Sequence, residues 1–122
     1  MSENTSNPVS ISIDMKKYRI RIHKSTLHLL GDPPYILLLI NPESRFVAIK
    51  SSDRPASDGL THKVARYIFQ SDASAEIYSH TLVKKLKELY PDLGAGNLYH
   101  MSGHVVPREN MAVFSMDTLT KI

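Results

Sequence analysis

The chain has 122 residues, of which 42% are hydrophobic and 22% are charged, and its formal net charge is +3. This length is enough for one hydrophobic core and too short for two, so we expect a disordered polar tail at 1–8 and a single domain at 9–122. The sequence has no cysteine, which excludes disulfides, thiolate chemistry and cysteine-ligated metal sites.

The first segment of the domain alternates between apolar and polar residues, and the phase of this alternation changes once. Val9, Ile11 and Ile13 form the first apolar set, and the second set is Tyr18, Ile20 and Ile22. The change predicts either a tight turn near 14–17 or a bulge in one long strand, and we favour the turn. Residues 15–19 are also typical of a natural protein start, which leaves open whether 1–14 are an extension.

Two helices are expected. Ser25 is the predicted cap of a short helix that runs to Leu30, because Gly31 and two prolines follow it. The second helix covers roughly 79–90 and ends before Pro91. Its apolar residues form one stripe while its charged residues face water; the stripe consists of Leu82, Val83, Leu86 and Leu89.

The remaining pattern predicts strands. Residues 36–40 are apolar on both faces and should form a central strand, with a turn at 41–44 and a partner strand at 45–50. A weak strand is expected at 62–69, and a hairpin at 98–106 and 111–116. The fold class is therefore α+β, with antiparallel strands and two helices on one face. The expected core comprises Ile36, Leu38, Ile40, Val47, Leu82, Leu86, Val113 and Phe114.

Two short segments of the chain are similar to each other. Residues 22–27 and 77–82 share Ile, Thr and Leu at three of six positions. Each is followed by a helical stretch, a proline and two strand-like runs around a proline-containing turn. This order predicts a pseudo-duplicated β-α-β-β unit, with half-repeats at 18–50 and 73–116.

The basic residues are concentrated in one half of the chain. Residues 16–66 contain ten Lys or Arg and four Asp or Glu, whereas 67–122 contain five and six. On a predicted strand at 17–24, basic side chains project from one face about 7 Å apart. The candidate nucleic-acid-binding residues are Lys17, Arg19, Arg21, His23 and Lys24. Such a row matches a phosphate backbone, or alternatively protects an exposed strand edge from aggregation.

No other pattern points to a chemical activity. His100 and His104 are four residues apart, but the sequence offers no third ligand at suitable spacing, so no metal is expected. The glycines at 94 and 96 follow a helix, which is the wrong order for a phosphate loop. We find no catalytic motif, expect no cofactor and predict that the protein is not an enzyme.

Aromatic residues are concentrated in the second half, away from the basic strand. Tyr67, Phe69, Tyr78, Tyr90 and Tyr99 are expected mainly in the core, with exposed ones suited to a protein interface. The longest apolar run, 35–40, is far shorter than the ~20 residues of a membrane helix. With no signal peptide either, we expect a cytoplasmic protein without a membrane partner.

Two segments carry a resemblance to a known group. Residues 30–43 (LGDPPYILLLINPE) and 77–82 (IYSHTL) resemble an uncharacterised group of small proteins from clostridia-like bacteria and their mobile elements. The resemblance covers most of 18–116 and implies no activity. We expect a regulatory or accessory protein that binds nucleic acid through the basic strand. The alternative is a protein-interaction module, either a homodimer or an inhibitor encoded by a mobile element.

Overall fold

The computed structural model describes residues 8–55, 61–64, 74–94 and 96–122. They form strands, two α-helices and short 3₁₀ turns, as expected for the α+β class. The helices are α1 (Lys24–Leu29) and α2 (His80–Leu89). The strands are β1 (Pro8–Asp14), β2 (Arg19–Ile22), β3 (Tyr35–Asn41), β4 (Phe46–Ser52), β5 (Thr61–Lys63), β6 (Ala75–Tyr78), β7 (Leu98–Val106), β8 (Met111–Ser115) and β9 (Thr120–Lys121).

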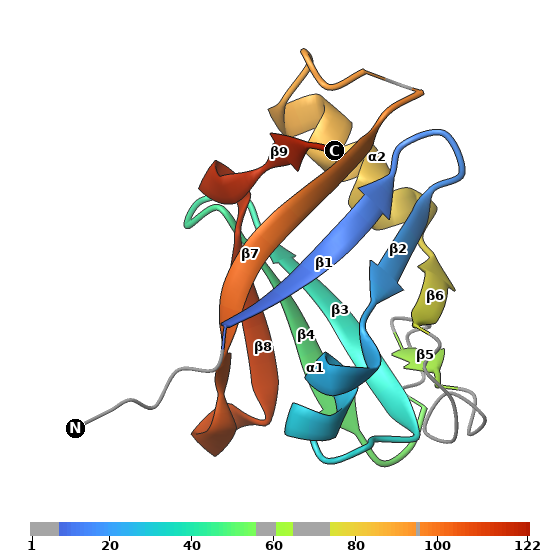
Figure 1. Cartoon of the computed structure of the whole chain (residues 1–122), viewed down its shortest axis with the longest axis vertical. Helices are drawn as coiled ribbons and strands as arrows, with labels where there is room; N and C mark the ends of the chain where they lie inside the picture. Colours follow the sequence, from blue (N-terminus) through green and yellow to red (C-terminus); the bar gives the residue numbers. More distant parts are fainter. Residues whose placement is uncertain (1–7, 56–60, 65–73, 95) are drawn as a thin grey trace.

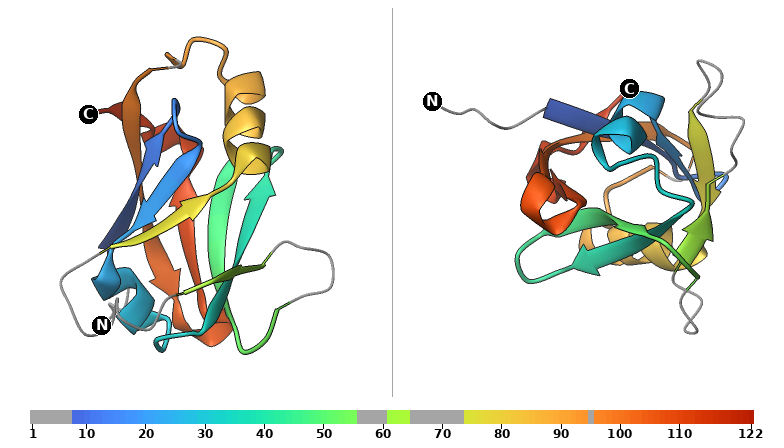
Figure 2. Two further views of the ribbon diagram at one scale, coloured as in Figure 1. Left: turned by 90° about the vertical axis from the view of Figure 1, so that its right-hand side faces the viewer. Right: turned by 90° about the horizontal axis from the view of Figure 1, so that it is seen from below.

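All the described strands belong to one antiparallel sheet. The order is β5-β3-β4-β8-β7-β1-β2-β6, and β9 pairs with β7. The sheet curls until its two end strands, β5 and β6, lie side by side (Figures 1 and 2), so that it forms a nearly closed barrel. We call the gap between β5 and β6, where the described residues show no pairing, the seam.

The barrel interior is filled by apolar side chains from alternate strand positions. On β1 and β2, Ile11, Ile13, Ile20 and Ile22 are almost completely buried. Six residues of the expected core are also buried: Ile36, Leu38, Val47, Leu82, Leu86 and Phe114. Two expectations were wrong, since Ile40 and Val113 are only half-buried. On β8 the inward positions are Ala112 and Phe114, and because side chains alternate along a strand, Val113 faces outward.

The expected turn near 14–17 is confirmed, and it joins β1 to β2 as a hairpin. Tyr18 has a left-handed φ of 54°, and the Asp14 side chain accepts hydrogen bonds from the backbone N–H groups of Lys16 and Lys17. β1 lies between β7 and β2 and pairs with both, so residues 8–14 are an integral part of the sheet. Residues 1–7, most of the expected disordered tail, lie outside the described residues.

The helices differ from expectation in two respects. The cap of α1 is His23, not Ser25: the His23 Nδ1 atom accepts the hydrogen bond of the Ser25 backbone N–H at 3.1 Å. The helices also do not share one face, since α1 lies near one end of the barrel and α2 near the other (Figures 1 and 2). Two other expectations are confirmed. The Ser79 hydroxyl caps α2 by accepting the Leu82 backbone N–H. Gly31 follows α1 in the left-handed conformation, with a φ of 87°.

Other strand predictions hold with small shifts of boundary. β3, β4, β7 and β8 occupy the predicted runs, and β3 is paired on both sides. Of the weak strand expected at 62–69, only Thr61–Lys63 is a strand, Val64 follows it, and the remainder lies outside the described residues. β9 had no clear sequence signal because it is only two residues long.

The strand pairings have an approximate twofold pattern. In the β2–β6 ladder, Ile20 faces Ile77 and Ile22 faces Ala75. When the alignment of 22–27 with 77–82 is extended backwards, Ile20 corresponds to Ala75 and Ile22 to Ile77. Exchanging corresponding residues therefore converts the Ile20–Ile77 pair into the Ala75–Ile22 pair, which belongs to the same ladder. With β9 left aside, exchanging β1–β4 with β5–β8 converts β3–β4 into β7–β8 and β3–β5 into β1–β7, and leaves β4–β8 and β2–β6 unchanged. Only β1–β2 has no described counterpart. Its counterpart would be β5–β6, the two strands at the seam.

Candidate nucleic-acid interface

The predicted basic strand is shorter in the structure than its sequence pattern indicated. Of the five candidate residues, only Arg19 and Arg21 lie on β2, and both project from the outer face of the barrel. Lys17 is exposed in the β1–β2 turn, His23 caps α1, and Lys24 is the first residue of that helix. The backbone changes direction at both ends of the four-residue strand, so the five candidate residues do not form one straight row.

Acidic side chains lie beside both arginines. The Arg21 guanidinium donates to the Glu76 carboxylate at 2.7 Å, and Arg19 lies 3.4 Å from the same oxygen. Arg19 also donates to Asp14 at 3.4 Å. Two arginines therefore share two carboxylates. A guanidinium has five N–H donors in a planar fork, so these contacts orient both groups without using all their donors.

The pairing alters the titration of Glu76. The hydrogen bond from Arg21 holds the pKa of Glu76 below its usual value, and the positive charges of Arg19 and Arg21 add to this effect. Partial desolvation acts in the opposite direction and is outweighed. Glu76 is consequently an anion at neutral pH, and it reduces the positive potential that the arginines present to solvent.

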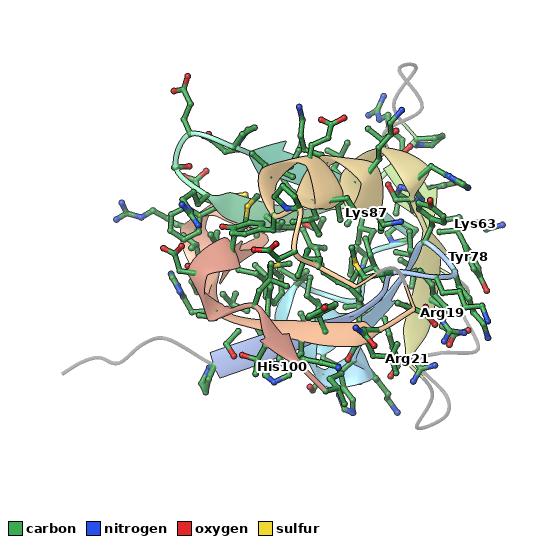
Figure 3. All side chains as sticks on the ribbon, turned by 90° about the horizontal axis from the view of Figure 1, so that it is seen from above. Arg19, Arg21, Lys63, Tyr78, Lys87 and His100 are labelled. Atoms are coloured by element: carbon green, nitrogen blue, oxygen red, sulfur yellow. The ribbon has the colours of Figure 1, made fainter. Side chains whose placement is uncertain are left out.

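An exposed aromatic ring lies next to the arginines. Tyr78 is 59% exposed at the end of β6 and is the direct register partner of Arg19 on β2. Facing residues in an antiparallel pair have Cβ atoms about 4.5–5.5 Å apart. Figure 3 shows Tyr78, Arg19 and Arg21 along one side of the molecule. The sequence placed this tyrosine away from the basic strand, and that expectation was wrong.

Contacts with α2 fix the turn beside Tyr78. The rings of Tyr18 and His80 stack with centroids 4.2 Å apart. The Lys87 ammonium lies 4.6 Å from the centre of the Tyr18 ring and 3.3 Å from its hydroxyl oxygen. The backbone N–H of Ser79 also donates to the Tyr18 carbonyl at 2.9 Å. These contacts hold the start of β2 and the end of β6 together, so Arg19 and Tyr78 are presented from a packed scaffold.

The other aromatic residues and the histidine pair lie on other elements. Tyr99 is buried, and its hydroxyl accepts the Gly94 N–H; Tyr90 is half-buried and packs against the core. Tyr67 and Phe69 lie outside the described residues. His100 and His104 both project outward from β7, and within the described part of the chain no three His, Cys, Asp or Glu residues form a metal-binding group.

The seam contains a concave feature. A pocket of about 400 Å³ is lined by β3, His62 of β5, and the segment from Tyr78 to Leu82. Burial lowers the pKa of His62, because desolvation disfavours the imidazolium. Tyr78 thus borders both the arginines of β2 and a largely apolar pocket.

Comparison with known proteins finds no matching family model, no similar curated sequence and no similar solved structure. The described helices include none that is long and apolar enough to cross a membrane.

Proposed function

We propose that the protein binds single-stranded nucleic acid on the outer face of β2 and β6, and that it does so without catalysing a reaction. The observation that carries the proposal is the position of Tyr78. It is a solvent-exposed ring directly opposite Arg19, which belongs to the arginine–glutamate cluster. We call the surface formed by Tyr78, Arg19, Arg21 and Lys17 the β2–β6 face.

The chemistry of this face favours single strands over duplexes. Bases stack on exposed aromatic side chains only when they are unpaired, and such stacking is worth about 1–3 kcal/mol per base. Arg19 and Arg21 lie about 7 Å apart along β2 and retain donors for phosphate oxygens. Lys17 and Lys16 add positive charge in the adjoining turn.

The carboxylates of Asp14 and Glu76 limit the strength of this interaction. With two acids beside two arginines, the net charge of the cluster comes from the lysines of the turn. Counterion release scales with the number of phosphates neutralised, so we expect a shallow salt dependence and moderate affinity. Stacking on Tyr78 then supplies a large part of the binding free energy.

Fluorescence anisotropy with a labelled pyrimidine oligonucleotide tests the proposal. At ~50 mM salt, where phosphate contacts are strongest, wild type should bind the oligonucleotide and bind a duplex more weakly. Tyr78→Ala should weaken binding about tenfold, as expected for one lost stacking partner. The matched control is Phe46→Ala, which removes another exposed ring from β4, 38% exposed, and should leave binding unchanged.

The arginines are tested separately. The double change Arg19→Ala and Arg21→Ala should weaken binding uniformly across sequences and flatten the salt slope by up to about two units. A double change of Arg54 and Arg108 to Ala, both exposed and outside the β2–β6 face, is the charge-matched control. If wild type retains no oligonucleotide at ~50 mM salt, or if the Tyr78 and arginine variants bind as well as wild type, the proposal is wrong.

A protein-interaction module is the second candidate, and the seam favours it. β6 pairs with β2 on one side, and no described strand pairs with its other side. An open strand edge is a template for a strand of another chain or a second copy. Light scattering after size exclusion distinguishes the two functions. A dimer that persists at high salt and excludes the oligonucleotide favours the interface.

We also propose that the two halves of the barrel arose from a duplicated β-α-β-β unit. The support is the register of the β2–β6 ladder, which the alignment of 22–27 with 77–82 maps onto itself. Superposing the backbone of 18–50 on that of the described residues in 73–116 tests this directly. If the two segments match in element order but differ in handedness, the sequence similarity is a coincidence and the duplication is wrong.

A further inference from the structure

A polar pocket lies at one end of the β2–β6 face. It has a volume of about 480 Å³ and opens to solvent on the outer surface of the barrel, where β1, β2 and β7 meet the start of α1. Its lining is dominated by hydroxyl groups and includes one guanidinium and one imidazole. The polar residues that line it are Ser10, Ser12, Arg21, His23, Ser25, Thr26, Ser74 and Ser102.

The strand register explains why the surface is hollow there. Ser10 and Ser12 project outward from β1, with Ser102 of β7 directly opposite Ser10 and Arg21 of β2 directly opposite Ser12. The small side chains leave the sheet uncovered at these positions. Arg21 and the His23 ring stand beside them and form part of the wall. The hollow therefore follows from serines placed side by side on neighbouring strands.

The donors in this pocket suit an anion. None of its described lining residues is a carboxylate, although Arg21 also donates to the neighbouring Glu76 at 2.7 Å. Hydroxyl groups can donate to an anion, and so can the Arg21 N–H groups that are not bonded to Glu76. The His23 Nδ1 atom accepts the Ser25 backbone N–H at 3.1 Å and lies 2.8 Å from the Ser25 hydroxyl oxygen. In the neutral tautomer that accepts this backbone bond, the ring proton is on Nε2, and that nitrogen can donate.

We propose that this pocket binds a terminal phosphate of the nucleic-acid strand that lies on the β2–β6 face, an inference that rests on the function proposed above. Arg21 lines the pocket, and Arg19, two residues earlier on β2 and about 7 Å away, faces Tyr78. A strand stacked on Tyr78 would therefore reach the pocket after passing both arginines. A terminal phosphate carries about −1.5 to −2 charges and three acceptor oxygens, which match a guanidinium fork surrounded by hydroxyls.

The test compares one oligonucleotide with a 5′-phosphate, a 3′-phosphate or no terminal phosphate. One phosphorylated form should bind wild type about tenfold more tightly than the unphosphorylated form. The double change Ser10→Val and Ser102→Val fills the pocket from exposed strand positions that tolerate β-branched residues. It should abolish the tenfold gain and leave binding of the unphosphorylated form unchanged. Ser51→Val, a strand serine outside the pocket, is the matched control and should retain the gain.

Three results would overturn the inference. The first is equal affinity of wild type for all three oligonucleotides. The second is a phosphate-dependent gain that survives in the double valine variant. The third comes from a titration with inorganic phosphate, monitored by amide chemical shifts: wild type should show saturable shifts at Ser10, Ser12 and Ser102, and their absence means that no phosphate binds there.

The same titration separates this inference from the function on which it rests. Phosphate-induced shifts at the pocket in a protein that binds no oligonucleotide would support a phosphate site and refute nucleic-acid binding. Tyr78→Ala provides the converse arm, since it should weaken all three oligonucleotides equally and leave the phosphate-induced shifts intact.

Discussion

Arg21 and Glu76 face each other across the β2–β6 ladder, and the guanidinium donates to the carboxylate at 2.7 Å. The same pair joins the arginines of the proposed interface to the acid that weakens their positive potential. Removing the Glu76 carboxylate should therefore increase the affinity for nucleic acid and decrease the stability of the fold.

Glu76→Gln should increase the affinity for a single-stranded oligonucleotide. The change keeps the shape of the side chain and removes one negative charge beside Arg19 and Arg21. At ~50 mM salt, one unit charge at close range in a solvent-exposed setting corresponds to roughly three- to tenfold in affinity. Anisotropy titration measures this affinity. Glu88→Gln is the control, because Glu88 is also in an ion pair, with Lys85, but lies on α2. Equal or weaker binding by Glu76→Gln argues against phosphate contacts at these arginines.

The same substitution should change how stability depends on pH. Arg21 and Arg19 lower the pKa of Glu76 in the folded protein, so the folded state favours the carboxylate more than the unfolded chain does. The resulting stabilisation is complete above the ordinary pKa, 4.5, and is lost as pH falls below it through the folded value. Thermal melts should therefore show wild type more stable than Glu76→Gln at pH 7, with the difference disappearing in acid. A difference that is constant with pH would exclude this ion pair as its cause.

Local chemistry allowed part of the fold to be predicted from the sequence. The phase change between Ile13 and Ile20 identified the β1–β2 hairpin because alternate side chains must share one face. The stripe that includes Leu82 and Leu86 identified α2 for the corresponding helical reason. The cap of α1 was assigned to Ser25, which is a common capping type, whereas the imidazole of His23 takes that role in the structure.

The candidate site depended on long-range register, which the sequence does not encode in any short pattern. β2 and β6 are separated by more than fifty residues, and Arg19 meets Tyr78 only because those strands pair in one register. Glu76 was likewise not expected beside the arginines. The sequence of β6 does contain a signal for the outward position of Glu76 and Tyr78. Apolar Ala75 and Ile77 alternate with these two residues, so that Glu76 and Tyr78 share the outer face of the strand.

The core can be tested at the helix that carries the clearest sequence signal. Leu86 on α2 is completely buried, with no exposed area. Leu86→Ala should lower the free energy of unfolding by about 2–5 kcal/mol, through lost apolar contact and the cavity that remains. Leu89→Ala is the matched control, since Leu89 lies on the same helix but is 37% exposed and should cost much less. Urea denaturation measures both, and similar losses for the two variants would contradict the orientation of α2.

Gly103 should be intolerant of any side chain, although it lies in a regular strand. A Cβ atom at this position would be 1.8 Å from the Val113 carbonyl oxygen, because β7 and β8 approach each other closely there. The obstacle is backbone, which cannot rotate away as a side chain can, so the β7–β8 ladder itself must shift. β7 pairs with β1, β8 and β9, and a shift would disturb several pairings at once. We expect Gly103→Ala to destabilise the protein by more than the ~1 kcal/mol that is usual for a point substitution.

Gly96→Ala provides the control, because a Cβ atom there would meet nothing within 4 Å. This variant should melt within a few degrees of wild type, because the added side chain meets no obstacle and slightly restricts the unfolded chain. The two alanine variants differ only in position, so the comparison isolates the backbone contact at Gly103. Equal melting temperatures for the two would mean that β7 and β8 are further apart at this point than the structure places them.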